Sequence, residues 1–345
     1  MSVKGSQLRI GLFATVAALA WVNALALFGD EAARWVAVVL QSAVGIGALC
    51  CAVVVSRQVM GFSRSWRLLV IAATLSWFVG ELSWWLGRAG SDTNAAPPAG
   101  VFAYFLPPVL SLAAMVLLAR YDGGLRAHRD TLFRHAPVVA VLDGLVAALS
   151  FSILVFVAGL GAMTGAALPR SQNTAVVIAY SLLELVVVVA AVLMAMAYPR
   201  DRPYRANYLL LSGGVVVIAA SDRVVAYLRT VDVEGGDLWS GVGAILGPLM
   251  IAFAVLQLRP QQAGRRREDV MDWVQSFLPY IGFLGIVMLL AFHVLIGRHT
   301  DTLVVCATVL MVVLVTARDG GDASAASADG AAVRGASPTG ASSPP

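Results

Sequence analysis

Residues Trp77 to Pro108, WFVGELSWWLGRAGSDTNAAPPAGVFAYFLPP, share a pattern of acid, base and proline with a second stretch 141 residues further along the chain. The corresponding residues are Glu81 and Asp222, Arg88 and Arg229, and Pro107 and Pro248. In both stretches the acid lies inside an apolar run long enough to form a membrane-spanning helix, where a charged side chain costs about 2.5–3.5 kcal/mol on insertion scales. We therefore expect each acid to have a partner or a ligand, and we expect an internal duplication.

The composition is that of a membrane protein. Apolar residues make up 59% of the chain and charged residues 13%, whereas about 25% of the residues of a soluble domain are charged. The mean hydropathy is +0.82. The three cysteines lie in apolar runs without metal-ligand spacing, so we expect no disulfide and no metal site. No catalytic motif is present, and we expect no enzymatic activity, no cofactor and no nucleic-acid binding.

Ten apolar segments are long enough, or nearly so, to span a bilayer as helices, which takes about 20 residues each. They cover residues 8–28, 33–55, 65–87, 99–120, 137–160, 174–197, 206–228, 238–258, 276–297 and 301–317. Lys and Arg gather in alternate loops, among them Arg57, Arg64 and Arg67 in one loop, on the side that holds the N-terminus. The positive-inside rule then predicts a protein of the bacterial cytoplasmic membrane with both termini in the cytoplasm.

The first segment has an alternative interpretation as a signal peptide. Lys4 and Arg9 precede an apolar run that ends in Ala24-Leu25-Ala26, which is a possible cleavage site. An uncleaved anchor fits the length of the run better. We therefore predict an all-α, polytopic transmembrane bundle of about ten spans.

The offset of 141 residues also divides the chain. It places the start of the second segment on that of the sixth, and the third on the seventh. We predict a first helix with its outer loop, two four-helix units related as a parallel repeat, a tenth helix, and a disordered cytoplasmic tail rich in Gly, Ala, Ser and Pro. These parts are residues 1–32, 33–173, 174–297, 298–318 and 319–345. The alternative is that apolar helices of similar length align without common descent.

Ionisable and aromatic residues in the outer halves of the predicted helices suggest a polar pocket inside the bundle. The candidate ligand-binding residues are Glu81, Trp84, Trp85, Tyr180, Glu184, Asp222, Arg223 and His293. Glu184 is the strongest candidate, because the same helix carries no basic residue near it and Tyr180 lies one turn earlier.

A structural role for the same residues remains open. Glu81 could pair with Arg88 or Arg223, and Asp222 with Arg229, while the tryptophans anchor the helices at the membrane interface. His293 is then a packed or interfacial histidine.

Three short motifs resemble the multi-span membrane input modules found ahead of GGDEF and EAL domains in bacterial cyclic-di-GMP enzymes. They are Leu142-Asp143-Gly144-Leu145, Tyr180-Ser181-Leu182-Leu183-Glu184-Leu185, and Ala220-Ser221-Asp222-Arg223 with Tyr227. The likeness covers roughly residues 65–317 and departs from the pattern at Ser181, where proline is usual. It implies a sensory membrane module. We expect no cyclase or phosphodiesterase activity from residues 1–345, because the tail after Arg318 has too few apolar residues to fold.

Three functions remain open on the sequence. The first is a non-enzymatic sensor that reads a small ligand or a lipid-phase signal in the outer-half pocket and signals to a separate cytoplasmic protein. The second is a small-molecule transporter, favoured by the parallel repeat and by Pro107, Pro108 and Pro248 inside predicted helices. The third is a membrane scaffold in which every acid is paired. Membrane lipids are expected partners in all three cases.

Overall fold

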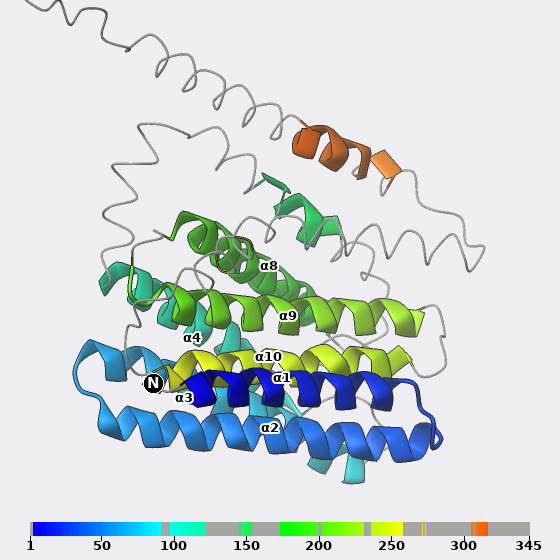
Figure 1. The fold of residues 1–345 in the computed structure, drawn as a ribbon. Coiled ribbons are helices and arrows are strands. Elements are labelled where there is room, and N and C mark those ends of the chain that lie inside the picture. Colours follow the sequence, from blue (N-terminus) through cyan, green and yellow to red (C-terminus); the bar gives the residue numbers. More distant parts are fainter. Residues whose placement is uncertain are drawn as a thin grey trace, which may run out of the picture.

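A computed structural model describes residues 3–90, 97–121, 145–146, 148–153, 173–198, 202–230, 236–257, 271, 273, 305–306 and 308–316. Within these ranges the chain is helical and contains no strand. The helices are α1 (Val3–Ala24), α2 (Asp30–Gln58), α3 (Phe62–Gly90), α4 (Pro98–Tyr121), α8 (Thr174–Ala197), α9 (Arg205–Thr230) and α10 (Gly236–Leu256) (Figure 1). The predicted all-helical class is confirmed.

Five of these helices, α2, α3, α4, α8 and α9, are long and apolar enough to cross a membrane. α1 and α10 contain shorter apolar stretches, Gly11–Ala24 and Gly241–Leu256. The structure therefore indicates a membrane protein but does not show ten spans. The segment predicted at 276–297 and the tail at 319–345 lie outside the described residues, and those at 137–160 and 301–317 are described only in part, as short helical pieces.

The described helices pack as two similar groups, which we name the first unit (α2, α3, α4) and the second unit (α8, α9, α10). Adding 141 to the numbers of the first unit brings α2 onto α8, α3 onto α9 and α4 onto α10. Within the units the strongest contacts are equivalent, since α3 packs on α4 as α9 packs on α10, and α2 packs on α3 as α8 packs on α9. Contacts between the units are equivalent as well, because α2 packs on α10 and α4 packs on α8.

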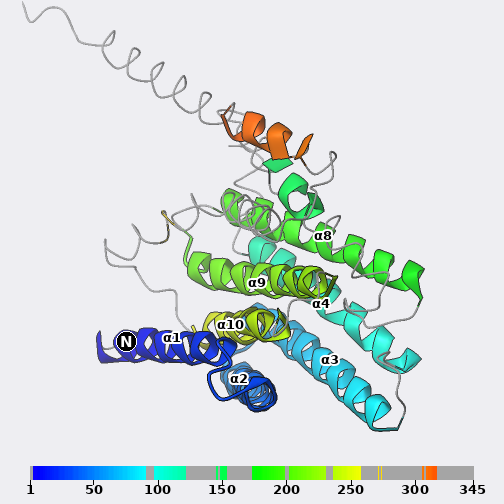
Figure 2. The same ribbon diagram turned by 90° about the vertical axis from the view of Figure 1, so that its right-hand side faces the viewer.

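These pairings are what a duplication would produce if the two copies were joined about a two-fold axis. Figures 1 and 2 show the resulting stack, in which α10 and α9 lie between α2 on one side and α8 on the other. α1 packs beside α10 and α2 as an addition to the two units. The cavity described below lies between the units.

Two glycines let α9 and α10 approach closely. A Cβ atom added at Gly214 would lie 2.8 Å from the carbonyl oxygen of Gly247, and one added at Gly247 would lie 2.9 Å from the carbonyl oxygen of Gly214. Small residues at facing positions are the usual way for membrane helices to gain van der Waals contact between backbones, since lipid supplies no hydrophobic drive for helix association. The α9–α10 pair is therefore a tightly packed part of the fold.

The C-terminal end of α10 is held by side chains from both units. Arg67 of α3 donates from Nε to the carbonyl oxygen of Val255 at 3.1 Å and from Nη2 to that of Gln257 at 3.0 Å. Asn207 of α9 donates from Nδ2 to the carbonyl oxygens of Ala254 at 2.7 Å and Gln257 at 3.1 Å. The last carbonyls of a helix have no partner inside it, so these two buried side chains cap α10.

Candidate ligand-binding site

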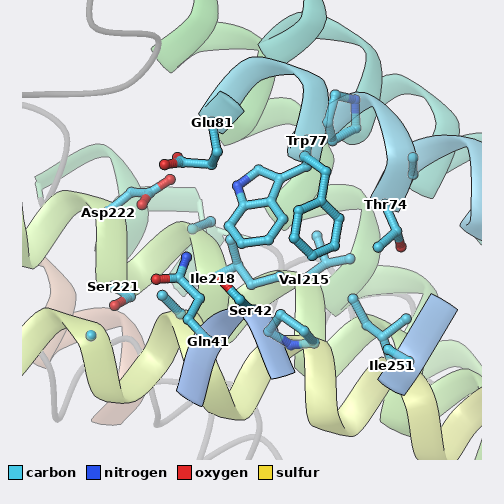
Figure 3. Close-up of a pocket in the computed structure, with 18 of the residues that line it drawn as sticks. Gln41, Ser42, Thr74, Trp77, Glu81, Val215, Ile218, Ser221, Asp222 and Ile251 are labelled. Carbon is cyan, nitrogen blue, oxygen red and sulfur yellow. The ribbon is translucent and has the colours of Figure 1, made fainter. Parts of the chain in front are cut away.

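A cavity of about 580 Å³ lies among α2, α3, α4, α8, α9 and α10 (Figure 3). Its volume is in the range of small-molecule sites, which are about 300–1,000 Å³. The aromatic and polar residues of its wall are Trp35, Trp77, Phe78, Trp84, Arg34, Gln41, Ser42, Thr74, Glu81, Ser111, Tyr180, Glu184, Ser221 and Asp222. An apolar cavity with a few polar groups is the composition expected of a binding site.

Part of the wall shows the same offset of 141 residues as the sequence. Seven pairs of lining residues are related by the 141-residue offset: Val70 and Leu211, Thr74 and Val215, Trp77 and Ile218, Phe78 and Ala219, Glu81 and Asp222, Trp84 and Val225, and Pro107 and Pro248. Positions four, seven, eight, eleven and fourteen residues apart fall on one face of a helix. α3 and α9 therefore present the same face to the cavity, which lies where the two units meet.

The two acids at corresponding positions of the 141-residue offset face each other in this cavity. In Figure 3 the carboxylates of Glu81 on α3 and Asp222 on α9 are turned toward one another, with the indole ring of Trp77 beside them. The hydroxyl of Tyr104, a fully buried side chain of α4, donates to Oε1 of Glu81 at 3.2 Å. Gln41 and Ser221 point toward the same region in Figure 3. Carboxylates from two helices thus converge on one polar end of the cavity.

Glu184 has a different environment from the one that the sequence suggested. Its Oε2 atom accepts a hydrogen bond from Nη2 of Arg223, whose Nη1 atom donates to Oγ of Ser181 at 2.7 Å. The side chains of Arg223 and Glu184 are 1% and 6% exposed, so this is a buried ion pair. Glu184 lacks a basic neighbour on its own helix, but α9 supplies one.

This pair corrects two details of the sequence analysis. Arg223 contacts Glu184 and is not part of the cavity wall, so the alternative in which it pairs with Glu81 is wrong. Glu184 contributes to the wall with its carboxylate in an ion pair, so it is not the isolated acid that the sequence suggested.

The structure brings five of the eight candidate residues to the cavity: Glu81, Trp84, Tyr180, Glu184 and Asp222. Trp84 and Tyr180 also form a buried aromatic cluster with Tyr104. The side chain of Trp85 and all of His293 lie outside the described residues, as do the side chains of Arg88 and Arg229. The alternative ion pairs that involve these two arginines fall outside the described part for the same reason.

Several lining residues were not among the candidates. Gln41 and Ser42 are adjacent polar residues in the middle of the long apolar run of α2, and this interruption is a signal that could have identified them. Trp77 lies one turn before Glu81 on the same face of α3. Ser221 belongs to the same turn as Asp222.

Within the described ranges, no group of three or more His, Cys, Asp or Glu side chains is placed to hold a metal ion. The polar groups of the described wall are carboxylates, an amide, hydroxyls, indole rings and the guanidinium of Arg34. Comparison of the chain with models of known protein families, with curated proteins and with solved structures finds no match.

Proposed function

We propose that this chain is a membrane protein of sensor type, which binds a small ligand in the cavity between its two units and signals to a separate cytoplasmic protein. The observation that carries the proposal is the position of the cavity. Corresponding faces of α3 and α9 form its walls, and both bring an acid to the same end. A ligand there contacts both units at once.

Such a ligand can change how the units pack. A ligand shifts a conformational equilibrium only by its difference in affinity for the two states. A ligand that contacts both units has different affinities for two arrangements in which the units are displaced relative to each other. α10 connects the cavity to one end of the bundle, since Gly241, Ala244 and Pro248 line the cavity while the carbonyls of residues 254–257 are capped by Arg67 and Asn207. We propose that movement of α10 carries the signal.

The cavity wall can be tested by filling it. Replacing Ile218 by Trp introduces the residue that the first unit carries at the corresponding position, Trp77, and adds an indole to the cavity. The matched control is Ile46→Trp on α2, where the side chain is 54% exposed. Small molecules of positive, negative and no net charge would be screened by thermal stability of the purified protein in lipid nanodiscs. We expect compounds that stabilise the wild type and Ile46→Trp but not Ile218→Trp.

A result in which Ile218→Trp responds to the same compounds as the wild type would reject the cavity as the ligand site. The sensor mechanism adds a second expectation, that a bound compound alters hydrogen–deuterium exchange at residues 251–257, the capped end of α10. Unchanged exchange there with the cavity occupied would reject the proposed route of the signal.

Transport is the second candidate function, and one structural observation favours it. Pro107 of α4 and Pro248 of α10 are corresponding residues inside helices, and both line the cavity. Parallel repeats with interrupted helices around a shared site are a common transporter architecture. Uptake into proteoliposomes separates the two functions, because a transporter accumulates a compound that binds in the cavity whereas a sensor does not.

A further inference from the structure

We propose that the ligand of the cavity is a neutral ring compound dissolved in the lipid phase, which enters sideways between α2 and α3. This inference rests on the proposed ligand-binding function and specifies the class of ligand and its route. It follows from the place where the cavity wall reaches the surface, from the residues around that opening, and from the composition of the interior.

The cavity wall reaches the surface of the described part of the chain between two helices. Three of the described lining residues are exposed, and they are Arg34 and Trp35 of α2 and Leu82 of α3. The lining residues that α4, α8, α9 and α10 contribute are buried or half-buried. α2 and α3 follow each other after a short turn and pack together, so the start of α2 and the end of α3 lie at the same end of the pair. We name the opening marked by Arg34, Trp35 and Leu82 the mouth.

A close contact between the two helices bounds the mouth. A Cβ atom added at Gly45 of α2 would lie 2.5 Å from Cζ of Phe78, so the ring of Phe78 packs directly on the backbone of α2. Phe78 also lines the cavity. Figure 2 views α2 nearly end-on and shows α3 running away from it toward the C-terminal end of α3. The mouth therefore lies where the two helices diverge beyond Phe78.

The surroundings of the mouth are apolar. α2 and α3 are each long and apolar enough to cross a membrane, and Trp35 and Leu82 lie inside these helices rather than at their ends. The side chains of Trp35 and Leu82 are 61% and 59% exposed, and their neighbours Val39 and Val79 are exposed as well. Lipid chains are as apolar as such side chains, so this surface faces lipid in a membrane. Arg34 lies one turn into α2, and an arginine near a helix end extends its charge to the headgroups.

The interior of the cavity suits a ring compound with a neutral polar group. Trp77, Phe78 and Trp84 line one side, and aliphatic side chains of α9 line the other. Aromatic rings pack on one another in offset or edge-to-face arrangements, which adds to the gain from apolar burial. Gln41 and Ser42 contribute an amide and a hydroxyl from the middle of α2, and neither side chain makes a hydrogen bond within the described part of the chain. A hydroxyl or carbonyl group on the ligand gives them a partner, whereas a charge would keep the ligand out of lipid.

The first experiment labels the cavity of the full chain in lipid nanodiscs with two photoreactive probes. Both carry a trifluoromethyl-diazirinyl group on a benzene ring; one is a neutral phenol, which dissolves in lipid, and the other is an anionic benzoate, which favours water. Leu211 and Val215 line the cavity and are buried, so label on them, located by mass spectrometry, reports occupancy. We expect the phenol to label both residues in a saturable manner and at least fivefold more than the benzoate does. Its label on the exposed Val39 is expected to rise in proportion to concentration.

The outcomes separate this inference from the proposed function. Ile218→Trp is expected to remove the saturable label, whereas the control Ile46→Trp keeps it. If the benzoate labels Leu211 and Val215 as strongly as the phenol and Ile218→Trp removes that label, the cavity stands as the ligand site and the lipid-phase class is overturned. If neither probe gives saturable label in the cavity, the inference and the proposed cavity site both fail.

The second experiment narrows the mouth. Leu82→Trp enlarges a side chain of the mouth, and Leu86→Trp, one turn further along α3 at an exposed position outside the described wall, is the matched control. The phenol is mixed rapidly with the protein and irradiated by a flash after increasing delays. Label on Leu211 and Val215 is expected to appear at least threefold more slowly in Leu82→Trp than in Leu86→Trp or the wild type. Size-exclusion elution and helical circular dichroism verify folding. Equal rates in the two variants would overturn the route through the mouth.

Discussion

The first and second units present the same face to the cavity with different chemistry on it. In the first unit that face carries Trp77, Phe78 and Trp84, and in the second it carries Ile218, Ala219 and Val225. The second unit alone has the buried pair of Glu184 and Arg223, because the corresponding residues of the first unit are Ala43 and Leu82. The acids Glu81 and Asp222, and one proline in each unit, are common to both.

Some features of the cavity wall are therefore common to both units, and others occur in one unit only. The acids and prolines occur in both units and line the cavity. The ion pair and the close contact of Gly214 with Gly247 occur in the second unit. The first unit has Ala73 and Leu106 at the positions that correspond to these two glycines. The second unit is held together by polar and backbone contacts, whereas the first contributes the aromatic wall.

The largest effect is expected from breaking the ion pair of the second unit. Glu184→Ala leaves the guanidinium of Arg223 buried without its partner, and removing one member of a buried pair costs about 3–5 kcal/mol. The double variant Glu184→Ala/Arg223→Leu copies the first unit and is expected to recover most of that stability, because an apolar replacement of a buried pair is often neutral. Thermal and urea denaturation in detergent measure both. A double variant as unstable as the single one would show that the pair does more than balance its own charges.

A smaller effect is expected where α9 and α10 touch. Gly214→Ala places a Cβ atom 2.8 Å from the carbonyl oxygen of Gly247 and 2.7 Å from Cγ1 of Ile251. Overpacking of this kind costs about 1–3 kcal/mol. Gly47→Ala on α2, where a Cβ atom would meet nothing within 4 Å, is the control and is expected to be neutral or slightly stabilising. Equal denaturation midpoints for the two variants would contradict the close approach of the backbones.

The smallest effect concerns a hydrogen bond of the first unit. Oγ of Ser76 donates to the carbonyl oxygen of Ala103 at 2.7 Å and links α3 to α4, whereas the second unit has Val217 at the corresponding position. Interhelical hydrogen bonds in membrane proteins average about 0.6 kcal/mol, so Ser76→Ala should lower the free energy of unfolding by about that amount. Ser83→Ala removes a bond to Gly80 within α3 itself and serves as the control. A loss of more than about 2 kcal/mol in Ser76→Ala would indicate a different role for the hydroxyl.

Much of the described fold could be predicted because the signals for it are local. The apolar segments predicted at 33–55, 65–87, 99–120, 174–197 and 206–228 correspond to α2, α3, α4, α8 and α9, with ends that differ by at most a few residues. A helix in a membrane satisfies its backbone within itself, so length and hydropathy suffice to locate it. The offset of 141 residues between Glu81 and Asp222 likewise predicts that they lie on corresponding helix faces.

The partners of long polar side chains could not be predicted in this way. Arg67 belongs by its sequence context to a loop rich in arginine, yet its side chain is fully buried and caps α10 from 188 and 190 residues away. Arg223 could have reached Glu81 or Glu184, and only the rotation of α9 against α8 decides between them. Such choices depend on how helices are turned toward each other.

The amino-acid sequence was enough to predict a helical chain with segments apolar enough to cross a membrane, to locate the described helices, and to find two acids at corresponding positions of a repeated pattern. Hydropathy and the period of the helix carry this information along the chain. Helix packing was needed to show that Glu184 pairs with Arg223 and that Glu81 and Asp222 are turned toward each other at one end of a cavity. The reason is physical: a buried charge is satisfied by whichever group packing brings within hydrogen-bond distance, and packing is a property of helix pairs rather than of any single stretch of sequence.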